Sequence, residues 1–210
     1  MTWLETLDPR LGAQLRFLIE ADRLKSVVRA NRIADGSRRE NTAEHSWHLA
    51  LFGVILAEYA TGPVEIGRVI EMLLIHDLVE IECGDTPLFD TVNVALQAER
   101  EEEAAIVVFG RLPDDQGQRL HALWQEFEAA ETHDARFAKA LDRFQPILLN
   151  HLAGGGTWVD YNVDLDRERA VTRRIDDGAP ALWAAAQSVF AEAVAMGWLK
   201  PGVAPDAASS

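Results

Sequence analysis

Three ionisable side chains lie in a segment whose other residues are almost all apolar. His76, Asp77 and Glu80 interrupt the hydrophobic run 69–81. Spacings of three and four residues place Glu80 beside the other two on one face of a helix. Burying such groups without partners costs several kcal/mol or more, so they must be paired, protonated or bound to a metal. From this segment alone, a hydrogen-bonded pair that caps a neighbouring helix remains an alternative.

A further histidine comes from a different segment. His45 is followed at spacings of four, three and four residues by Leu49, Phe52 and Leu56. This pattern predicts that His45 faces inward from a helix that begins at Thr42. His48 lies three residues further on, and we interpret it as a surface histidine or one that supports a ligand.

Asp142 lies between Leu141 and Phe144 in a third segment. On local sequence a surface ion pair with Lys139 or Arg143 is the competing interpretation. Two imidazoles and two carboxylates would together suit a borderline divalent ion and leave coordination positions for water and substrate. His121 and His133 lie in more polar surroundings, and we interpret both as surface residues.

Arginines crowd one short segment of this acidic protein, at Arg29, Arg32, Arg38 and Arg39. A guanidinium fork matches phosphate oxygens in a bidentate way. We therefore expect at least one of them to reach the metal site. A solvated loop that pairs with the excess carboxylates is the alternative for Arg38 and Arg39. The glycines at 154–156 lack the lysine and the strand of a P-loop, so we interpret them as a connection near the pocket rim.

Helical periodicity dominates the elements that must position these residues, and no stretch alternates convincingly as a strand. The sequence predicts an all-α, single-domain bundle. We expect helices at 9–25, 42–60, 64–81, 95–110, 114–130, 133–152 and 166–198. The first is capped by Asp8, with Leu11, Leu15, Leu18 and Ile19 facing inward. The last is interrupted at 178–180, and the tail 201–210 is expected to be disordered.

Composition limits the possible partners. The formal net charge of −14 argues against a general nucleic-acid binder and against an anionic membrane surface. Small anionic substrates remain possible, because a local pocket can oppose the global field. The single cysteine, Cys83, cannot form an intrachain disulfide. With no signal core and no apolar run of about 20 residues, we expect a cytoplasmic protein.

The arrangement of His45, then His76-Asp77, then Asp142 resembles the H…HD…D signature of the HD-domain superfamily. The surrounding stretches 39–46, 74–80, 84–85 and 140–144 make the resemblance closer. They are similar to the branch that contains the bacterial 5′-deoxynucleotidases and HD-domain-containing protein 2. The resemblance spans about 15–150.

This resemblance implies a bundle of the HD-domain type, with its core at about 15–150 and a helical extension at 160–198. It implies a single divalent ion, compatible with Mn, Co, Zn, Mg, Ni or Fe(II). The ligands carried over are His45, His76, Asp77 and Asp142. Glu80 matches the catalytic carboxylate, Asp85 a second acidic residue at the substrate end, and Arg29 a phosphate-contacting arginine. Ala30 replaces the aromatic neighbour of that arginine, so nucleoside selectivity is expected to differ.

The implied activity is a 5′-nucleotidase that acts on (deoxy)nucleoside 5′-monophosphates. One alternative is an HD-domain di- or triphosphohydrolase or an oxygenase, and the other is a non-catalytic module that binds a metal or a nucleotide. Glu80 and Asp85 argue against the non-catalytic module, because a structural metal site needs neither. A homodimer is implied by the family and by the apolar final helix, which carries Leu182, Trp183, Val189, Phe190 and Trp198.

Overall fold

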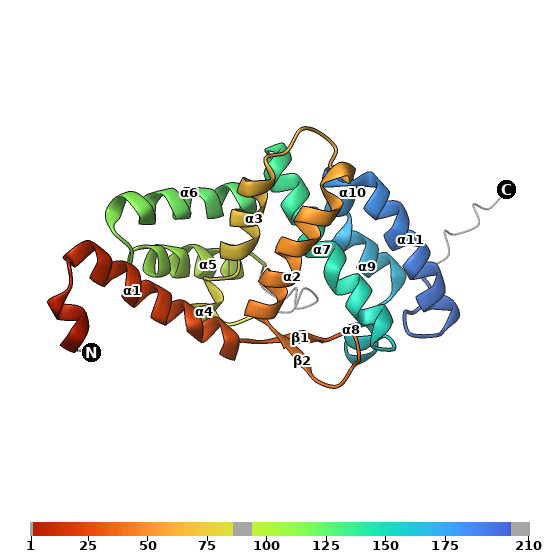
Figure 1. The fold of residues 1–210 in the computed structure, drawn as a ribbon. Helices are drawn as coiled ribbons and strands as arrows, with labels where there is room; N and C mark the ends of the chain where they lie inside the picture. The colour runs from red at the N-terminus through yellow and green to blue at the C-terminus, as the bar shows by residue number, and fades with distance from the viewer. Residues whose placement is uncertain (1, 86–93, 203–210) are drawn as a thin grey trace.

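The computed structural model describes residues 2–85 and 94–202, and it is a helical bundle with one short hairpin (Figure 1). Its helices are α1 Pro9–Ala21, α2 Thr42–Leu56, α3 Ile66–Ile75, α4 Glu80–Cys83, α5 Val94–Phe109, α6 Asp114–Ala129, α7 His133–Leu152, α8 Gly156–Asp160, α9 Leu165–Thr172, α10 Arg174–Gly178 and α11 Pro180–Ala195. Short 3-10 turns cover Thr2–Thr6, Asp22–Ser26 and Ala57–Tyr59. The predicted all-α class is confirmed.

Helix α7 is the centre of the bundle. Helices α2, α3, α6, α10 and α11 all pack against it. In Figure 1, α1, α5 and α6 lie toward one end of the molecule and α8 to α11 toward the other. The side chains of Phe137, Leu141 and Ile147 on α7 are almost fully buried. A residue on the inner face of α7 is therefore within reach of elements from both halves of the chain.

Helix α2 begins where the sequence indicated. The side chain of Asn41 accepts a hydrogen bond from the backbone N–H of Glu44, and the Glu44 carboxylate accepts one from the N–H of Asn41. This capping box satisfies backbone donors that the first turn leaves free. It fixes the start of α2, so His45 lies in the first turn of the helix.

The expected helix at 64–81 is divided in two. Helix α3 ends at Ile75, residues 76–79 form a turn, and α4 follows. In this turn the backbone N–H of Glu80 bonds to the Asp77 carbonyl, 3.0 Å away. The indole Nε1 of Trp124 instead donates to the His76 carbonyl at 3.0 Å. The bond from Trp124 thus replaces the helical bond that the Glu80 N–H would make to the His76 carbonyl. Hydrophobic periodicity gives no sign of such a replacement.

Two further expectations were wrong. The segment after α1 contains strands β1 Val28–Arg32 and β2 Arg39–Asn41, which pair antiparallel with an irregular register. On α1 the Asp8 cap is confirmed, but Leu11 and Leu18 are 45% and 62% exposed. Phe17 is the buried side chain there, so the inward face lies to one side of the predicted one.

The interruption of the last helix is confirmed at Gly178, Ala179 and Pro180. A Cβ on Gly178 would lie 2.1 Å from the carbonyl oxygen of Arg136, so only glycine allows α10 to approach α7 so closely. Pro180 begins α11. Most of the expected disordered tail, 203–210, lies outside the described residues, as does the loop at Pro87. Within the described residues, no helix has both the length and the apolar character needed to cross a membrane.

Candidate metal centre

The structure brings together three of the predicted ligands from three elements. His45 comes from the first turn of α2, His76 from the end of α3 and Asp142 from the middle of α7. One nitrogen or oxygen atom from each lies within 4.8 Å of the others. Asp77 lies beside this group, since its Oδ2 is 3.1 Å from His76 Nε2 and 3.8 Å from His45 Nε2. Nitrogen and carboxylate atoms therefore converge on one point.

The orientation of the His45 ring follows from its neighbours. A carboxylate such as Glu40 only accepts hydrogen bonds, so Gln145 must donate Nε2–H to it, at 2.8 Å. The Oε1 of Gln145 then faces His45 Nδ1 at 3.2 Å and must accept from it. This assigns the proton of a neutral His45 to Nδ1 and leaves a lone pair on Nε2. Gln145 and Glu40 are both buried, and neither belonged to the predicted site.

His76 is oriented in the same sense by the backbone. Its Nδ1 lies 2.9 Å from the Leu73 carbonyl oxygen, to which it donates. Its Nε2 is buried and has no hydrogen-bond partner among the described residues. This nitrogen lies 3.6 Å from the Oδ1 of Asp142 as well as near Asp77. Burial opposes a positive charge on His76, but Asp77 and Asp142 outweigh it and raise its pKa to about 10.

The Nε2 atoms of both imidazoles therefore face carboxylate oxygens. His45 Nε2 is 3.1 Å from Asp142 Oδ1, which is a contact between two acceptors unless a cation lies between them. A proton can relieve this repulsion at one contact, whereas a divalent ion relieves it at all of them. Imidazole with carboxylate is a donor set that suits divalent first-row metals. The residues present fit a metal ion.

Arg29 crosses from β1 into this cluster of carboxylates. Its Nη1 bonds to Asp77 Oδ2 at 2.9 Å and lies 3.7 Å from Asp85 and 3.9 Å from Glu80. Its Nε lies 3.8 Å from Glu40. Burial disfavours the charge, but Asp77, Asp85 and Glu80 raise the pKa of Arg29 further above its ordinary value. Arg29 therefore remains a cation and neutralises the acidic side of the site.

Glu80 and Asp85 lie beside this arginine, as the sequence indicated. The Thr42 hydroxyl donates to Glu80 Oε2 at 2.7 Å. Burial and the nearby Asp77 charge raise the pKa of Glu80 to about 9. Burial also raises the pKa of Asp85, although Arg29 opposes this shift. Both carboxyl groups thus hold protons more tightly than exposed ones do.

The cluster opens into a cavity of about 540 Å³. The residues that line it include His76, Asp77 and Asp142 of the site, and also Arg29 and Ala30. Two further lining residues, Asn150 and Thr157, lie on either side of the glycines at 154–156. The amide of Asn150 accepts from the Thr157 N–H at 3.0 Å and fixes the glycine turn beside the cavity. This volume is sufficient for a small organic ligand.

The other histidines and arginines of the sequence argument do not reach the metal cluster. His48 Nδ1 accepts from Gln145 Nε2 at 3.2 Å and so supports the site from behind. His121 pairs with Glu102, and His133 packs against Gly62. Arg38 forms an ion pair with Glu44, while Arg32 donates to the carbonyl of Gly36. The sequence contained one signal for Gln145, since it lies three residues after Asp142 on α7.

Comparisons with known proteins agree with this geometry. A solved structure of a predicted metal-dependent phosphohydrolase from Magnetospirillum magnetotacticum is 50% identical, with a TM-score of 0.87 over 91% of this chain and 96% of that one. The 5′-deoxynucleotidase HDDC2 of Mus musculus is 30% identical over 135 residues, which are 64% of this chain. The Homo sapiens protein of that name is 29% identical over 135 residues.

The match covers slightly less than two thirds of the length of these curated relatives, at 66% and 65%. The HD-domain family model matches residues 21–183, which include every predicted ligand and both acidic residues. The chain therefore belongs to the HD domain family.

Proposed function

We propose that the protein is a divalent-metal-dependent phosphohydrolase that removes the phosphate from (deoxy)nucleoside 5′-monophosphates. The observation that carries this proposal is the convergence of His45, His76 and Asp142, with Asp77 beside them, at one cavity that His76, Asp77 and Asp142 line. The names of the relatives support the same activity, since they are a 5′-deoxynucleotidase and a predicted metal-dependent phosphohydrolase.

In this proposal His45, His76, Asp77 and Asp142 hold one metal ion. Such an ion would polarise a phosphate oxygen and lower the pKa of the attacking water. Its identity among Mn, Co, Zn, Mg, Ni and Fe(II) is left to experiment. Gln145 and the Leu73 carbonyl keep the two imidazole rings turned so that Nε2 of each faces the site.

We assign proton movement to Glu80. The hydrogen bond from Thr42 fixes its Oε2 and leaves Oε1 to orient water and to carry the proton that the leaving oxygen requires. Arg29 holds Asp77 in place and, with Asp85, forms the substrate end of the site, where we expect it to contact the phosphate. Ala30 lines the cavity next to Arg29 and leaves room for the nucleoside.

The experiment is a screen of all nucleoside monophosphates against metal-stripped protein, with each metal added back separately. We expect orthophosphate release with at least one metal and little without any. A protein that binds the metal but releases no phosphate from any nucleotide or generic phosphomonoester would overturn the assignment. It would favour a module that only binds.

The single His/Asp cluster in 2–85 and 94–202 supports a phosphohydrolase over an oxygenase. An oxygenase should need a second iron and further histidines, and His121 and His133 lie away from the cluster. Hydrolysis of nucleoside di- and triphosphates belongs in the same screen. The preferred leaving group then separates the two hydrolase activities.

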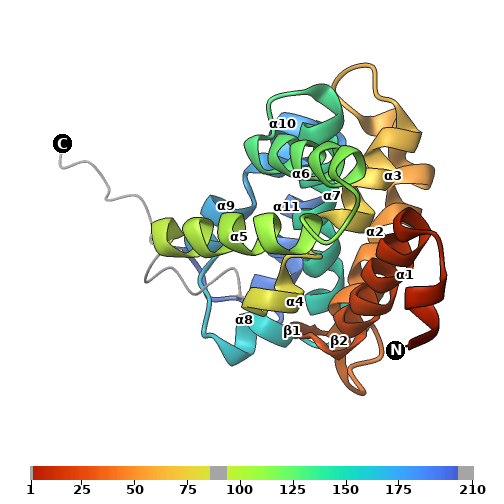
Figure 2. The same ribbon diagram turned by 90° about the vertical axis from the view of Figure 1, so that its left-hand side faces the viewer.

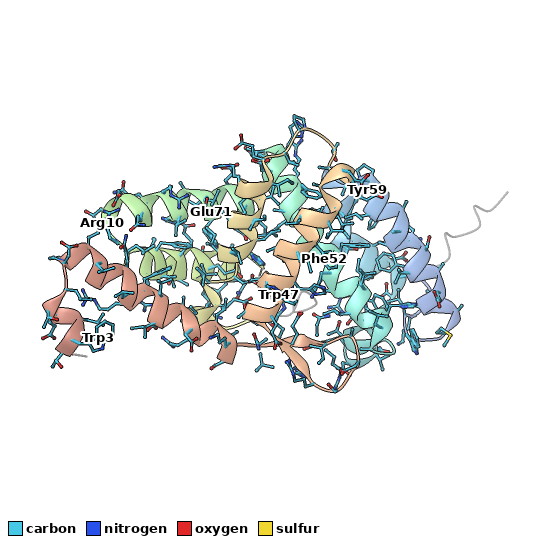
Figure 3. The ribbon with its side chains drawn as sticks, viewed as in Figure 1. Trp3, Arg10, Trp47, Phe52, Tyr59 and Glu71 are labelled. Carbon is cyan, nitrogen blue, oxygen red and sulfur yellow. The ribbon has the colours of Figure 1, made fainter. Side chains whose placement is uncertain are left out.

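We further propose that two copies of this chain form a homodimer through α2. The final helix is a poor surface for this, because Leu182 and Phe190 are buried in the chain's own core. Helix α2 instead exposes Trp47 by 64% and Ile55 by 65%, and Leu51 and Val54 are exposed at helical spacing from them. Figure 3 labels Trp47 on α2 and Tyr59 in the turn that follows it, and Tyr59 is also exposed. No charged residue lies between Glu44 and Glu58. A second copy of an acidic chain therefore meets no like-charge repulsion there.

Light scattering should give twice the chain mass, and Trp47→Glu or Ile55→Glu should give a monomer. Leu152→Glu is the matched control, since Leu152 is also 61% exposed but lies on α7. A monomeric wild type would exclude this dimer. The cytoplasmic location expected from the sequence is likewise a proposal, and cell fractionation tests it.

A further inference from the structure

The cavity beside the metal cluster has walls of opposite charge. On one side lie Glu80, Asp85 and Glu101, from α4, the residues after it, and α5. On the other side lie Lys139, Arg143 and Arg174, from α7 and α10. Figure 2 shows α5 and α10 at different levels around α7. Arg29 lies against Glu80 and Asp85, and both carboxyl groups hold their protons tightly, so an anion in this cavity is attracted to the second wall.

The three cations of the second wall are not equally free to bind a ligand. Lys139 is buried, and its Nζ bonds to both carboxylate oxygens of Glu128, at 2.9 and 3.0 Å. It also lies 4.1 Å above the Phe127 ring. The charge of Lys139 is therefore already compensated inside the protein, and we assign this residue to the support of the wall.

Arg143 is incompletely satisfied. Its nearest carboxylate oxygen is Asp142 Oδ2, 3.7 Å from Nε, and its side chain is 23% exposed. The Nε atom is buried and has no hydrogen-bond partner among the described residues. Because Asp142 is a proposed metal ligand, it cannot serve Arg143 fully. A guanidinium donor without a partner in the chain is available to an acceptor from outside it.

Arg174 is exposed on α10, and the described part of the chain gives it neither a hydrogen bond nor an ion pair. The buried acid Glu168 does not neutralise this wall either. Burial raises the pKa of Glu168 to about 7, against the opposing effects of Trp158 and Arg143. Glu168 also comes no closer than 4.0 Å to Arg143 within the described residues.

We propose that Arg143 and Arg174 form an anion-binding wall that holds the phosphate of the substrate against α7 and α10. Guanidinium forks match phosphate oxygens in pairs. Arg143 follows Asp142 in sequence, so an anion bound there lies next to the metal cluster. Arg29, with four carboxylates within 3.9 Å, has less charge left for a ligand. The catalytic use of this wall rests on the proposed phosphohydrolase function, but anion binding to it does not.

The probe is inorganic phosphate, titrated calorimetrically into metal-loaded protein. We expect Arg143→Ala to weaken binding about tenfold or more, the usual effect of losing a charged hydrogen-bonding group. Arg143→Lys keeps the charge but lacks the forked guanidinium, so its phosphate affinity should lie between those of Arg143→Ala and wild type. Arg174→Ala should weaken binding several-fold. Arg173→Ala removes the same charge one residue away, from a side chain that does not line the cavity, and should bind like wild type.

Metal content and melting temperature are measured for every variant. If Arg143→Ala does not fold, the phosphate affinities of Arg143→Lys and Arg174→Ala test the proposal instead. The proposal is overturned if a folded, metal-loaded Arg143 or Arg174 variant binds phosphate as wild type does. It is also overturned if Arg173→Ala loses as much affinity as Arg174→Ala, since the effect would then be general charge.

The two proposals fail in different ways. If no nucleotide is hydrolysed but phosphate affinity depends on Arg143 and Arg174, the anion wall stands and the phosphohydrolase function falls. If nucleotides are hydrolysed while phosphate affinity is indifferent to both arginines, the anion wall falls and the function stands.

Discussion

The amide of Gln145 accepts a hydrogen bond from His45 because its other end is committed to Glu40. A single side chain thereby decides which imidazole nitrogen is free for a metal. Supporting partners of this kind typically change metal affinity by about 10- to 100-fold. We expect Gln145→Leu to weaken metal binding by that amount in a chelator-competition titration.

Gln125→Leu is the control for this variant. Gln125 also donates to a carboxylate, Glu102, but on α6 and away from the cluster. It should bind metal as the wild type does. Equal affinities in the Gln145 and Gln125 variants would mean that the tautomer of His45 does not depend on Gln145.

Glu80 and Asp77 should separate chemistry from metal binding. Glu80→Ala should lower kcat by about 10²–10⁴-fold, the usual worth of a general acid or base, while keeping the metal. Asp77→Ala should lose the metal together with activity. Phosphate release and elemental analysis on the same preparations make the comparison. A metal-free Glu80→Ala would reassign Glu80 as a ligand, and near-normal kcat would make it structural.

Metal removal should lower the melting temperature. Without the metal, a proton on His76 must offset the carboxylate charge that faces the two imidazoles, and a ligand bound only to the folded state stabilises it by mass action. At a hundredfold excess over Kd this is about 2.7 kcal/mol, or roughly 5–10 °C for a chain of this size. Calorimetry with and without chelator measures the shift. His45→Ala should show almost none, whereas His121→Ala should respond like the wild type.

Arg29→Ala should raise KM for the nucleotide and lower kcat, with metal content unchanged. The variant should also melt at a lower temperature, because it leaves Asp77, Glu80 and Asp85 facing one another without their cation. Arg32→Ala is the matched control, since within the described residues the Arg32 guanidinium bonds only to the Gly36 carbonyl, at 3.3 Å. The phosphate role of Arg29 is excluded if the Arg32 variant shows the KM effect and the Arg29 variant does not.

Glu168 should make stability depend on pH. Its pKa is raised from 4.5 to about 7 by burial, so the folded state holds its proton more tightly than the unfolded state does. The contribution of this proton to the free energy of unfolding is fully present below about pH 4.5 and is lost as pH rises through 7. The loss amounts to at most about 3 kcal/mol. The glutamine of Glu168→Gln does not ionise, so the variant escapes this loss. The difference in unfolding free energy, variant minus wild type, should therefore increase between pH 5 and pH 8. Parallel pH profiles in urea denaturation would contradict this.

The residues of the cluster could be singled out from sequence, because an ionisable group in an apolar segment costs free energy when it is buried without a partner. A histidine or an aspartate within an apolar segment will be buried and must find a partner there. His45 and His76 both lie in such segments. Asp142 carried it weakly, since Lys139 and Arg143 offered it surface partners. In the structure Lys139 turns instead to Glu128, which no local pattern indicates.

What the sequence did not reveal depends on contacts between distant segments. The break after Ile75 depends on Trp124, which is 48 residues from the His76 carbonyl that it bonds. The role of Gln145 depends on Glu40, which is 105 residues away. The hairpin of β1 and β2 is too short for alternation to stand out, and the exposed Leu18 follows from what α1 packs against. Periodicity describes one element at a time, and each of these features needs two.

His45 and Asp142 lie 97 residues apart along the chain, yet they face each other across 3.1 Å. A nascent chain leaves the ribosome from its N-terminus, so His45, His76 and Asp77 emerge well before α7 does. Until α7 is made, the incomplete set has neither Asp142 nor the Gln145 that turns His45. Metal acquisition should thus follow release of nearly the whole HD domain, and a ribosome-stalled chain ending before α7 should emerge without its ion.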